Sequence, residues 1–539
     1  MTHKGLPVGR TLAEVLAEKA ALLPNADAIL HGGRRWSYAE LLAEAEQTAR
    51  ALLAYGVVAG DRVGALLGND SEWMQVALGA SMIGATFVPL NTWYKSTELA
   101  WTLRHCGLKL VVSASRFLKA DYRALFTEVL PRLKDAGRLP DPAFPELRTL
   151  VFLEDAPAGC LSWADFLKGG DGVSGDALAL ARATVSPDAA AFVLYTSGST
   201  AEPKGVMLNH RGVIENGFQL GLRRGITAED RVWLGSPLFY GLGATNALPA
   251  TLTAGAALVL QGHFDAGAAL DVIENTRATV FYGTGNMTRG MLDHADYAPA
   301  RVGSLEKGNA GTVAEYKRLT LVEMGISKAV PAYGLTETYG NATVGEVDDD
   351  IEVKVATNGR PLPDMEMIIV DPQTGERLGR GETGLVLIRG HTTPGYLNSP
   401  EETAKALRSD GFFDTGDLGS FDADGRFLFH SRLKEVLKSG GINVSPVEVE
   451  QLLAGHPDVR DAYVVGVGDP VQGEKIVAFV DVSASVGEDA LKSYVKERAA
   501  SFKTPHHILF RSEAQLPRLA SGKVAKYRLA EEARRELGL

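Results

Sequence analysis

A twelve-residue segment, Tyr195–Val206, combines residue types that can hold a phosphate group. It reads YTSGSTAEPKGV and follows directly on the apolar run AFVL. Glycine and small hydroxyl residues let backbone N–H groups turn toward an anion, and a lysine adds positive charge. The lysine is not spaced as in the GxxxxGK(S/T) nucleotide loop, so a different phosphate loop and a flexible surface turn both remain open. The candidate phosphate ligands are Thr196, Ser197, Gly198, Ser199, Thr200 and Lys204.

Five further motifs follow in order along the chain. They are YGLTET (Tyr333–Thr338), GYLNSPEET (Gly395–Thr403), TGDLG (Thr415–Gly419), SRLKEVLKSGGINVSPVEVE (Ser431–Glu450) and LPRLASGKVAKYRL (Leu516–Leu529). With the phosphate loop, this ordered set resembles the adenylate-forming superfamily, which includes acyl-CoA synthetases, the adenylation domains of peptide synthetases and firefly luciferase. The resemblance implies that a carboxylate attacks the α-phosphorus of Mg·ATP. Acyl-AMP and pyrophosphate result, and the thiol of CoA then displaces AMP.

The resemblance also implies roles for single residues. Lys523, in Ser-Gly-Lys, matches the lysine that bridges the carboxylate and the α-phosphate. Thr336 and Glu337 match the residues that contact the α-phosphate and ligate Mg²⁺, a hard cation that needs oxygen ligands. Asp417 and Arg432 match the ribose contacts. Further contacts with the nucleotide are implied for Gly308, Asn309, Ala310, Tyr333 and Gly334. By position alone, such lysine, glutamate and aspartate residues would simply be solvated.

Lys434 matches the hinge residue of the superfamily, whose C-terminal domain rotates between the two half-reactions. The rotation implied here removes Lys523 from the site and brings Lys438 in. The accompanying CoA tunnel would include Ser439, Gly440 and Gly441. Paired glycines let the backbone pass close to a narrow pantetheine arm, although an ordinary turn into the strand INV explains them equally well.

The segment Pro237-Leu-Phe-Tyr240 departs from the usual Pro-Leu-Phe-His of the superfamily. Tyr240 would form an aromatic gate to the acyl site. Unlike the histidine usually found there, a tyrosine does not change its charge near neutral pH. Adenylation domains for amino acids have an aspartate after this phenylalanine, and its carboxylate pairs with the ammonium group of the substrate. No aspartate follows Phe239, which argues against an amino-acid substrate. Small and neutral candidates favour an apolar acid, aliphatic or aromatic. The expected pocket residues are Phe239, Tyr240, Gly241, Gly283, Thr284, Gly285 and Met287.

Short apolar runs alternate with helical patterns through most of the chain, which predicts α/β layers with largely parallel sheets. The expected strands are Leu108–Ser113, Thr149–Leu153, Ala191–Tyr195, Ala257–Leu260 and Thr279–Tyr282. The helical patterns include Ser37–Leu53 and Ala266–Thr276.

The pattern changes after Gly359. Strands separated by glycine and aspartate turns indicate an antiparallel or barrel-like unit, and they are Met365–Val370, Gly384–Arg389 and Arg426–His430. After Arg432 a compact α+β module follows, with helices at Pro446–Ala454 and Glu488–Ala500 and strands at Asp461–Gly468 and Lys475–Val482. We therefore expect two domains. Residues 1–432 would form an N-terminal AMP-binding and acyl-binding domain of layered α/β subdomains plus the barrel-like subdomain. Residues 433–539 would form a small mobile α+β domain that carries Lys523.

Composition narrows the class of protein. A net charge of −11 argues against a nucleic-acid partner. The two cysteines form no CxxC pair and the N-terminus has no uninterrupted apolar run, so a cytoplasmic protein is expected. The long uncharged stretches Trp73–Tyr94 and Val232–Gly262 are broken by Gly, Pro and Asn, which predicts buried helix plus buried strand rather than a membrane span. A homodimer is the working expectation for the oligomeric state.

Three functions remain open at this point. The leading interpretation is an ATP-dependent acyl- or aryl-CoA ligase that acts on a small-molecule carboxylic acid. An acyl-AMP ligase that loads a carrier protein would share the same motifs. A nucleotide-binding sensor or scaffold without catalysis is the third, but the retained charged residues, among them Glu337, Asp417 and Lys523, argue against it.

Overall fold

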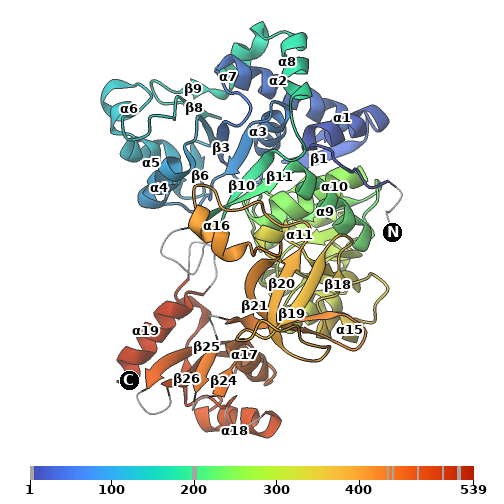
Figure 1. The fold of residues 1–539 in the computed structure, drawn as a ribbon, viewed down its shortest axis with the longest axis vertical. Helices are drawn as coiled ribbons and strands as arrows, with labels where there is room; N and C mark the ends of the chain where they lie inside the picture. The colour runs from blue at the N-terminus through green and yellow to red at the C-terminus, as the bar shows by residue number, and fades with distance from the viewer. Residues whose placement is uncertain are drawn as a thin grey trace. The chain divides into compact units, whose positions relative to one another are not determined.

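The chain forms two compact units in a computed structural model, whose ribbon is shown in Figure 1. The structure describes residues 5–196, 203–433, 436–439, 442–469, 473–499, 503–518 and 524–538. The first unit comprises Met1–Thr312, Tyr316–Glu366 and Ile388–Phe413, and the second comprises Val313–Glu315, Met367–Leu387 and Asp414–Leu539. This division places strands before Arg432 in the second unit, so the expected domain boundary at 433 stays a prediction.

A seven-stranded sheet in the first unit has the order β11-β10-β4-β3-β5-β8-β9. Its strands are β3 (Arg62–Leu66), β4 (Thr86–Pro89), β5 (Leu110–Ser113), β8 (Thr149–Phe152), β9 (Leu161–Ser162), β10 (Ala190–Thr196) and β11 (Lys204–Asn209). All neighbours are parallel except the antiparallel pair β10–β11. A small hairpin, β6 (Arg116–Phe117) and β7 (Ala120–Asp121), lies apart from this sheet.

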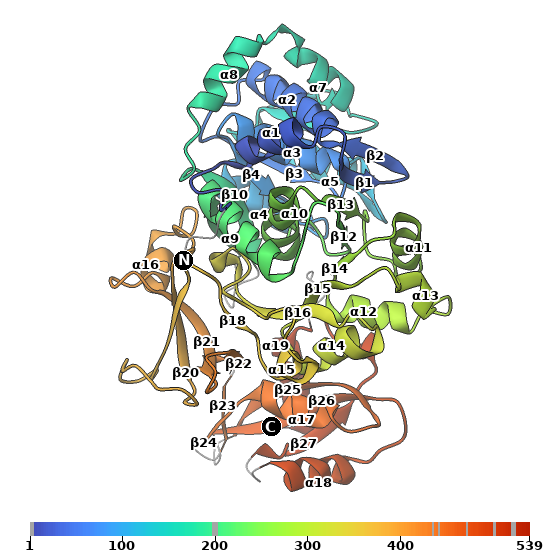
Figure 2. The ribbon, with the colours of Figure 1, turned by 90° about the vertical axis from the view of Figure 1, so that its right-hand side faces the viewer.

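A nine-stranded sheet in the same unit has the order β18-β17-β16-β15-β14-β12-β13-β1-β2. Its strands are β1 (Asp27–His31), β2 (Arg34–Ser37), β12 (Arg231–Leu234), β13 (Ala257–Leu260), β14 (Val280–Tyr282), β15 (Lys307–Gly311), β16 (Lys328–Tyr333), β17 (Thr343–Val344) and β18 (Arg360–Pro361). Its central strands are parallel, and Figure 2 shows β14, β15 and β16 side by side. The carboxyl ends of parallel strands share one edge of a sheet, where open α/β sheets place their ligands. Gly283, Ala310 and Gly334 lie at this edge.

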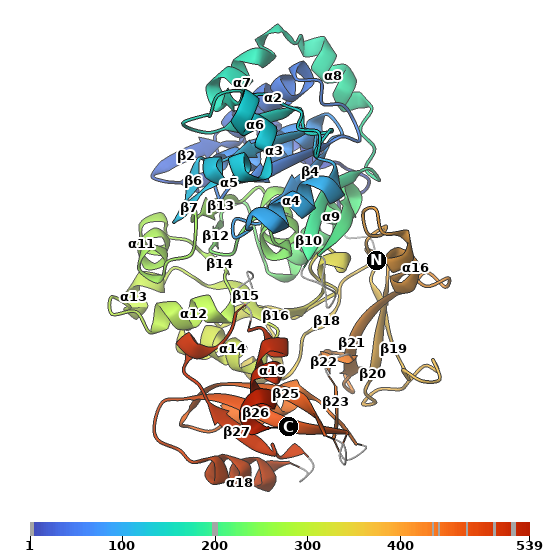
Figure 3. The same cartoon turned by 90° about the vertical axis from the view of Figure 1, so that its left-hand side faces the viewer.

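Helices flank both sheets, and Figure 3 shows α4 next to α5. Up to Phe413 they are α1 (Leu12–Leu22), α2 (Tyr38–Ala54), α3 (Ser71–Met82), α4 (Ser96–Cys106), α5 (Tyr122–Val129), α6 (Pro131–Ala136), α7 (Trp163–Gly169), α8 (Gly175–Ala183), α9 (His210–Arg223), α10 (Leu248–Ala254), α11 (Ala266–Thr276), α12 (Gly285–Leu292), α13 (Pro299–Val302), α14 (Ala314–Arg318), α15 (Ile351–Ala356) and α16 (Pro400–Ala406). The start of α2 is a capping box, because Ser37 and Glu40 each accept the other's backbone N–H.

The two uncharged stretches fold as expected. The first contains α3 and β4, and the second contains β12, a π-helical turn at Leu242–Ala247, α10 and β13. Nearly every residue of α3 and all four residues of β13 are buried in the core. Over the described ranges, every helix is too short or too polar to cross a bilayer.

The second unit contains two sheets. A four-stranded sheet has the order β19-β20-β21-β22, and this sheet is the expected barrel-like part. Its strands are β19 (Glu366–Val370), β20 (Gly384–Arg389), β21 (Phe413–Phe421) and β22 (Phe427–Arg432). A five-stranded sheet follows, in which β27 joins β26 at the side of the path β24-β23-β26-β25.

The five-stranded sheet consists of β23 (Leu437–Ser439), β24 (Ile442–Val444), β25 (Val459–Asp469), β26 (Gly473–Val482) and β27 (His507–Phe510). The helices of this part are α17 (Pro446–Ala454), α18 (Glu488–Arg498) and α19 (Lys526–Leu537). The expected fold class, a large α/β part with a small α+β part, is confirmed. The helix expected at Glu488–Ala500 ends earlier, at Arg498.

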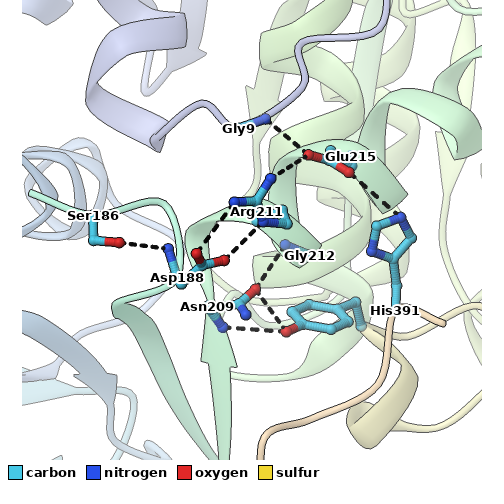
Figure 4. Close-up of polar contacts among 9 residues, drawn as sticks. Gly9, Ser186, Asp188, Asn209, Arg211, Gly212, Glu215 and His391 are labelled. Atoms are coloured by element: carbon cyan, nitrogen blue, oxygen red, sulfur yellow. Dashed lines mark hydrogen bonds and ion pairs between the residues drawn. The ribbon is translucent and has the colours of Figure 1, made fainter.

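A polar cluster around the buried Glu215 holds the N-terminal arm against α9 (Figure 4). The N–H of Gly9 donates to Oε1 of Glu215 at 2.9 Å, and Nη1 of Arg211 lies 3.6 Å from the same oxygen. Nε2 of His391 lies 3.7 Å from the other carboxylate oxygen, and Nε of Arg211 also lies 2.7 Å from Asp188. Burial lowers the pKa of His391. The negative charges of Glu215 and Asp364 raise this pKa and so partly offset the effect of burial. One glutamate therefore joins the arm, α9 and the chain after β20.

His210, the first residue of α9, makes folding sensitive to acid. It is fully buried, and burial lowers its pKa to about 4. The unfolded chain, with a histidine pKa of about 6.5, binds more protons than the folded chain between these two values, so stability falls as the pH drops through this window. We expect that the free energy of unfolding of His210→Asn falls less over this pH window than that of the unchanged protein, by on the order of 3 kcal/mol at most. Thermal midpoints measured from pH 7 to pH 4 test it. The exposed His263→Asn is the control, and equal pH slopes for His210→Asn and the unchanged protein would contradict the prediction.

Candidate active site

The expected phosphate loop connects the two strands of a hairpin. Strands β10 and β11 are antiparallel, with Thr196 opposite Lys204 and Tyr195 opposite Gly205. Ser197, Gly198, Ser199 and Thr200 lie outside the described residues. The hairpin thus brings both described ends of the loop together at one place.

The motif that begins at Gly395 pairs with the hairpin. The N–H of Leu397 donates to the carbonyl of Gly205 at 2.8 Å, and the N–H of Met207 donates to the carbonyl of Gly395 at 3.1 Å. An antiparallel bridge joins Val206 and Tyr396. Two motifs that are distant in the sequence therefore form one stretch of sheet.

Lys204 forms an ion pair within the protein. Its Nζ lies 2.5 Å from Oε2 of Glu402 and 5.0 Å from the centre of the Tyr396 ring. The hydrogen bond from Lys204, followed by that from Lys405, lowers the pKa of Glu402 to about 2. Glu402 and Tyr396 belong to the motif Gly395–Thr403, but no local pattern indicates a role for either residue, because their partners are far away in the sequence.

Glu337 lies on a single 3₁₀ turn, Thr336–Thr338, directly after β16. Its side chain is buried, with the residue 9% exposed, and Oε1 accepts the hydroxyl of Tyr396 at 2.8 Å. The N–H of Thr393 donates to the Glu337 carbonyl at 2.7 Å. Both the backbone and the side chain of Glu337 are therefore fixed by one segment of chain.

Tyr339 follows this turn and anchors its other end. It adopts a left-handed conformation with φ of 56°, and its hydroxyl donates to Oδ1 of Asn209 at 2.9 Å. Asn209 also caps α9 by accepting the N–H of Gly212, where an added Cβ would lie 2.1 Å from the tyrosine ring. The turn that carries Glu337 is thus attached to the end of β11.

The oxygen atoms near Glu337 fit a hard divalent cation. In the part of the chain that the structure describes, no three His, Cys, Asp or Glu residues gather closely enough to form a metal cage. Mg²⁺ is commonly bound by one or two carboxylates together with substrate phosphates and water. A single buried carboxylate, on the residue that follows Thr336 in the sequence, fits that mode of binding.

The expected adenine-side residues lie on β15. Gly308 has φ of 136°, and an added Cβ would lie 2.1 Å from the carbonyl oxygen of Phe281, so only glycine fits. Nδ2 of Asn309 donates to the carbonyl of Gly283 at 3.0 Å, and its Oδ1 accepts from Arg224 at 3.3 Å. Asn309 therefore holds β15 to the end of β14. Its expected contact with the nucleotide stays a prediction.

Tyr333, Gly334 and Ala310 lie close to this part of the sheet. Tyr333, with 4% exposure, ends β16, and Ala310 is buried on β15. An added Cβ on Gly334 would lie 2.5 Å from Cα of Asn341. The backbone directly after β16 therefore packs closely against the segment at Gly340 and Asn341. The described nucleotide candidates of this unit thus meet at the carboxyl edge of the nine-stranded sheet.

Aromatic rings surround the first acyl-pocket candidates. The ring centre of Phe239 lies 5.4 Å from Trp93, and that of Tyr240 lies 6.1 Å from Trp93. Nδ2 of Asn91 donates to the Tyr240 hydroxyl at 3.4 Å, and burial raises the pKa of this tyrosine. A Cβ added to Gly241 would lie 3.8 Å from Oγ1 of Thr336, so these candidates reach the turn that carries Glu337.

The remaining acyl candidates lie where β14 leads into α12. A Cβ on Gly283 would lie 2.3 Å from the Phe281 ring, and one on Gly285 would lie 2.0 Å from the Tyr316 ring. Ring packing therefore requires both glycines. Thr284 is exposed, and Sδ of Met287 lies 4.0 Å from Oγ of Ser236. A role of these residues in lining an acyl pocket stays a prediction.

Asp417 and Arg432, the expected ribose contacts, lie opposite each other on β21 and β22 in the second unit. Oδ1 of Asp417 lies 3.3 Å from Nε of Arg432, with the carboxylate 3% and the guanidinium 52% exposed. Oγ1 of Thr415 accepts the N–H of Asp417 at 3.0 Å. The sheet register therefore creates a fixed acid–base pair from two motifs.

Lys434, Gly440, Gly441 and Lys523 lie outside the described residues, as does the side chain of Lys438. Ser439 is buried on β23, where it pairs with Ile442 of β24. Arg518 and Val524, on either side of the segment with Lys523, form an antiparallel bridge.

Comparisons with known proteins cover nearly the whole chain. A family model described as AMP-binding enzyme matches residues 16–397, and one described as AMP-binding enzyme C-terminal domain matches residues 448–523. A Mycobacterium tuberculosis protein named 3-[(3aS,4S,7aS)-7a-methyl-1,5-dioxo-octahydro-1H-inden-4-yl]propanoyl:CoA ligase is 35% identical over 97% of this chain and 99% of its own.

A medium-chain acyl-CoA ligase, ACSF2, from rat mitochondria is 30% identical over 99% of this chain and 89% of its own. The crystal structure of ATP-bound MatB from Rhodopseudomonas palustris superimposes with a TM-score of 0.83. It is 28% identical and covers 97% of this chain and 99% of its own. The likeness in sequence and in structure therefore extends over most of this chain and most of each relative.

Proposed function

The chain belongs to the family of AMP-binding enzymes, the adenylate-forming superfamily, and from this membership we propose which residues activate the acid and which acid they accept. The protein is an ATP-dependent acyl- or aryl-CoA ligase that forms AMP. The observation that carries this function is the match of both family models together with full-length relatives that are CoA ligases.

In the first half-reaction, the residues stabilise charge that spreads over the phosphoryl oxygens. Fixed cations and donors around such oxygens supply most of the catalysis in reactions of this type. Lys523 would bridge the acid and the α-phosphate, and the hairpin loop with Lys204 would hold the β- and γ-phosphates. Thr336 would donate to the α-phosphate, while Glu337 would hold Mg²⁺. When bound, this ion neutralises phosphate charge and thereby favours release of pyrophosphate.

The Lys204–Glu402 ion pair bears on how the loop meets ATP. Because Glu402 already neutralises Lys204, the lysine must exchange this partner or share it when phosphate arrives. The pair is about a quarter to a third exposed, so water screens it and exchange costs little. Glu402 therefore occupies the place of a phosphate oxygen beside Lys204 and holds the lysine near the loop.

The ribose would bind the buried carboxylate of Asp417, with Arg432 beside it. We expect Asp417→Asn to raise the KM for ATP by ~10–100-fold, because hydrogen bonds to a charged group contribute about 1.5–3 kcal/mol. The kcat should change much less, since the ribose does not react. Steady-state kinetics with ATP varied would measure both constants.

Asp422→Asn is the matched control, because Asp422 is a turn aspartate of the same sheet that accepts only nearby backbone N–H groups in the described structure. An unchanged KM for ATP in Asp417→Asn would contradict the ribose assignment. So would an equal effect in the control.

In the second half-reaction, the C-terminal part would rotate about Lys434. Lys523 would leave the site, and Lys438, Ser439, Gly440 and Gly441 would line a tunnel for CoA. The position of Ser439 supports this proposal, since it is buried at the end of β23 and directly precedes the glycine pair in the sequence. The mobile domain would be residues 433–539.

The acid is proposed to be apolar, aliphatic or aromatic. Trp93, Phe239 and Tyr240 form an aromatic group that directly precedes Gly241 along the chain, and the neutral phenol of Tyr240 offers no charge to a substrate. The named relatives support an apolar acid, since one acts on a propanoyl chain on fused rings and one on medium-chain acyl groups.

Acid-dependent ATP–pyrophosphate exchange over a panel of carboxylates, with and without CoA, tests the function. We expect exchange with apolar acids and AMP-forming thioester synthesis when CoA is present. Exchange without thioester formation would favour transfer to a carrier protein, and no exchange with any acid would favour a sensor or scaffold. A cytoplasmic location and a homodimer remain proposals, which fractionation of cells and light scattering would check.

A further inference from the structure

Tyr396 connects two charged groups that the proposed function places at the phosphates of ATP. Its hydroxyl donates to Oε1 of Glu337 at 2.8 Å, while Nζ of Lys204 lies 5.0 Å from the centre of its ring. The residue is 7% exposed, so water does not compete freely for the hydroxyl. One side chain thus contacts both the metal-binding carboxylate and the lysine of the phosphate loop.

The backbone of Tyr396 is firmly held. Its N–H donates to Oγ1 of Thr403 at 2.9 Å, and it forms a β-bridge with Val206. Gly395 precedes it with φ of 143°, and an added Cβ there would lie 2.6 Å from the Thr403 side chain. The Tyr396 hydroxyl is therefore held in place, and its hydrogen bond determines the orientation of the Glu337 carboxylate.

This hydrogen bond restricts how Glu337 can bind a cation. A carboxylate oxygen that accepts a hydrogen bond has one lone pair fewer for a metal, so the bond to Oε1 favours ligation through the second oxygen. Mg²⁺ requires compact octahedral coordination and suits a one-oxygen carboxylate, whereas Ca²⁺ takes more ligands and readily accepts both oxygens. Hydrogen-bond partners of a ligand commonly set its orientation.

We propose that Tyr396 is a positioning residue that holds Glu337 to one-oxygen ligation and so favours Mg²⁺·ATP over Ca²⁺·ATP. The proposal rests on the proposed function, because Glu337 must bind the metal of the nucleotide. Its effect is on metal choice as well as on affinity, and a purely structural tyrosine would not change metal choice.

Tyr396→Phe removes the hydroxyl and keeps the ring beside Lys204. Calorimetric titration of the full-length enzyme with Mg·ATP and with Ca·ATP, in the absence of acid, measures binding without turnover. We expect the Kd for Mg·ATP to rise about tenfold, as for other changes next to a metal ligand. The Kd for Ca·ATP should rise much less, so that the preference for Mg²⁺ falls by roughly fivefold or more.

A second variant guards against misfolding of the first. Glu337→Asp keeps the carboxylate but shortens its side chain, which draws it away from the Tyr396 hydroxyl, and the same loss of metal preference is expected. Tyr122→Phe is the matched control, because Tyr122 also donates a buried hydroxyl, to the carbonyl of Thr92 at 2.7 Å. It should leave both dissociation constants unchanged.

A Mg²⁺ preference that falls less than about threefold in Tyr396→Phe would overturn the inference and leave the proposed function intact. Weakening of both metal complexes by the same factor is one such result. If the unchanged protein bound no Mg·ATP and showed no acid-dependent exchange, the proposed function itself would fail.

Discussion

Glu337→Gln is expected to lower acid-dependent ATP–pyrophosphate exchange by about 10²–10³-fold, the effect of losing one charge-stabilising group at a reacting centre. Glutamine has nearly the same shape and can still accept the Tyr396 hydroxyl through its amide oxygen. The variant therefore changes the charge that meets Mg²⁺ while the surrounding fold is kept. Exchange measured across a range of Mg²⁺ concentrations should show partial recovery at high concentration, because the weakened site can be filled by mass action.

Glu306→Gln provides the control for this experiment. Glu306 lies just before β15, and it is an exposed glutamate paired with Lys328. Its variant should exchange at the unchanged rate. If Glu337→Gln kept its rate within about threefold of the original, the assignment of Glu337 as the metal ligand would be wrong.

Lys523→Ala should separate the two half-reactions. Adenylation of the acid is expected to fall by about 10³-fold or more, because the charge that bridges the carboxylate and the α-phosphate is lost. Conversion of chemically prepared acyl-AMP to the thioester should continue nearly unchanged, since Lys523 is proposed to leave the site before CoA reacts. Pyrophosphate exchange reports the first step, and thioester formation from acyl-AMP reports the second.

Lys526→Ala is the matched control, because Lys526 belongs to the same motif but pairs with Glu450 at 2.7 Å. It should leave both half-reactions intact. Equal loss of both steps in Lys523→Ala would contradict the proposed rotation about Lys434, since a lysine that left the site could not serve the second step.

Local patterns predicted the elements that local forces determine. The bounds expected for β13, α11, β20 and α17 agree with the structure, because apolar runs and end signals coincide there. The segment Lys526–Leu537, for which no helix was expected, folds as α19. Its apolar face includes the buried Leu529 and Ala533, and the partly buried Ala530 and Leu537 pack beside them. Leu529, Ala533 and Leu537 recur at intervals of four residues, so the helical spacing is present in the sequence among the many charged residues.

Contacts between distant segments could not be predicted in the same way. The motifs located Lys204, Glu337 and the segment from Gly395, but no spacing indicates that Tyr396 would join the first two. For Asn309, the resemblance implied a contact with the nucleotide but gave no sign of the hydrogen bond that its side chain donates to the carbonyl of Gly283. Register between strands decides such contacts, and register depends on the whole sheet.

The four-stranded sheet of the second unit determines where the chain can be divided. Strand β20 lies between β19 and β21, although β21 begins at the point where the first unit ends. A fragment that stopped at Phe413 would therefore carry β20 with an exposed edge, and such edges recruit other strands and cause aggregation. A fragment that stopped after Arg432 would include every strand of this sheet. Residue 432 is thus a sound end point for a shortened protein.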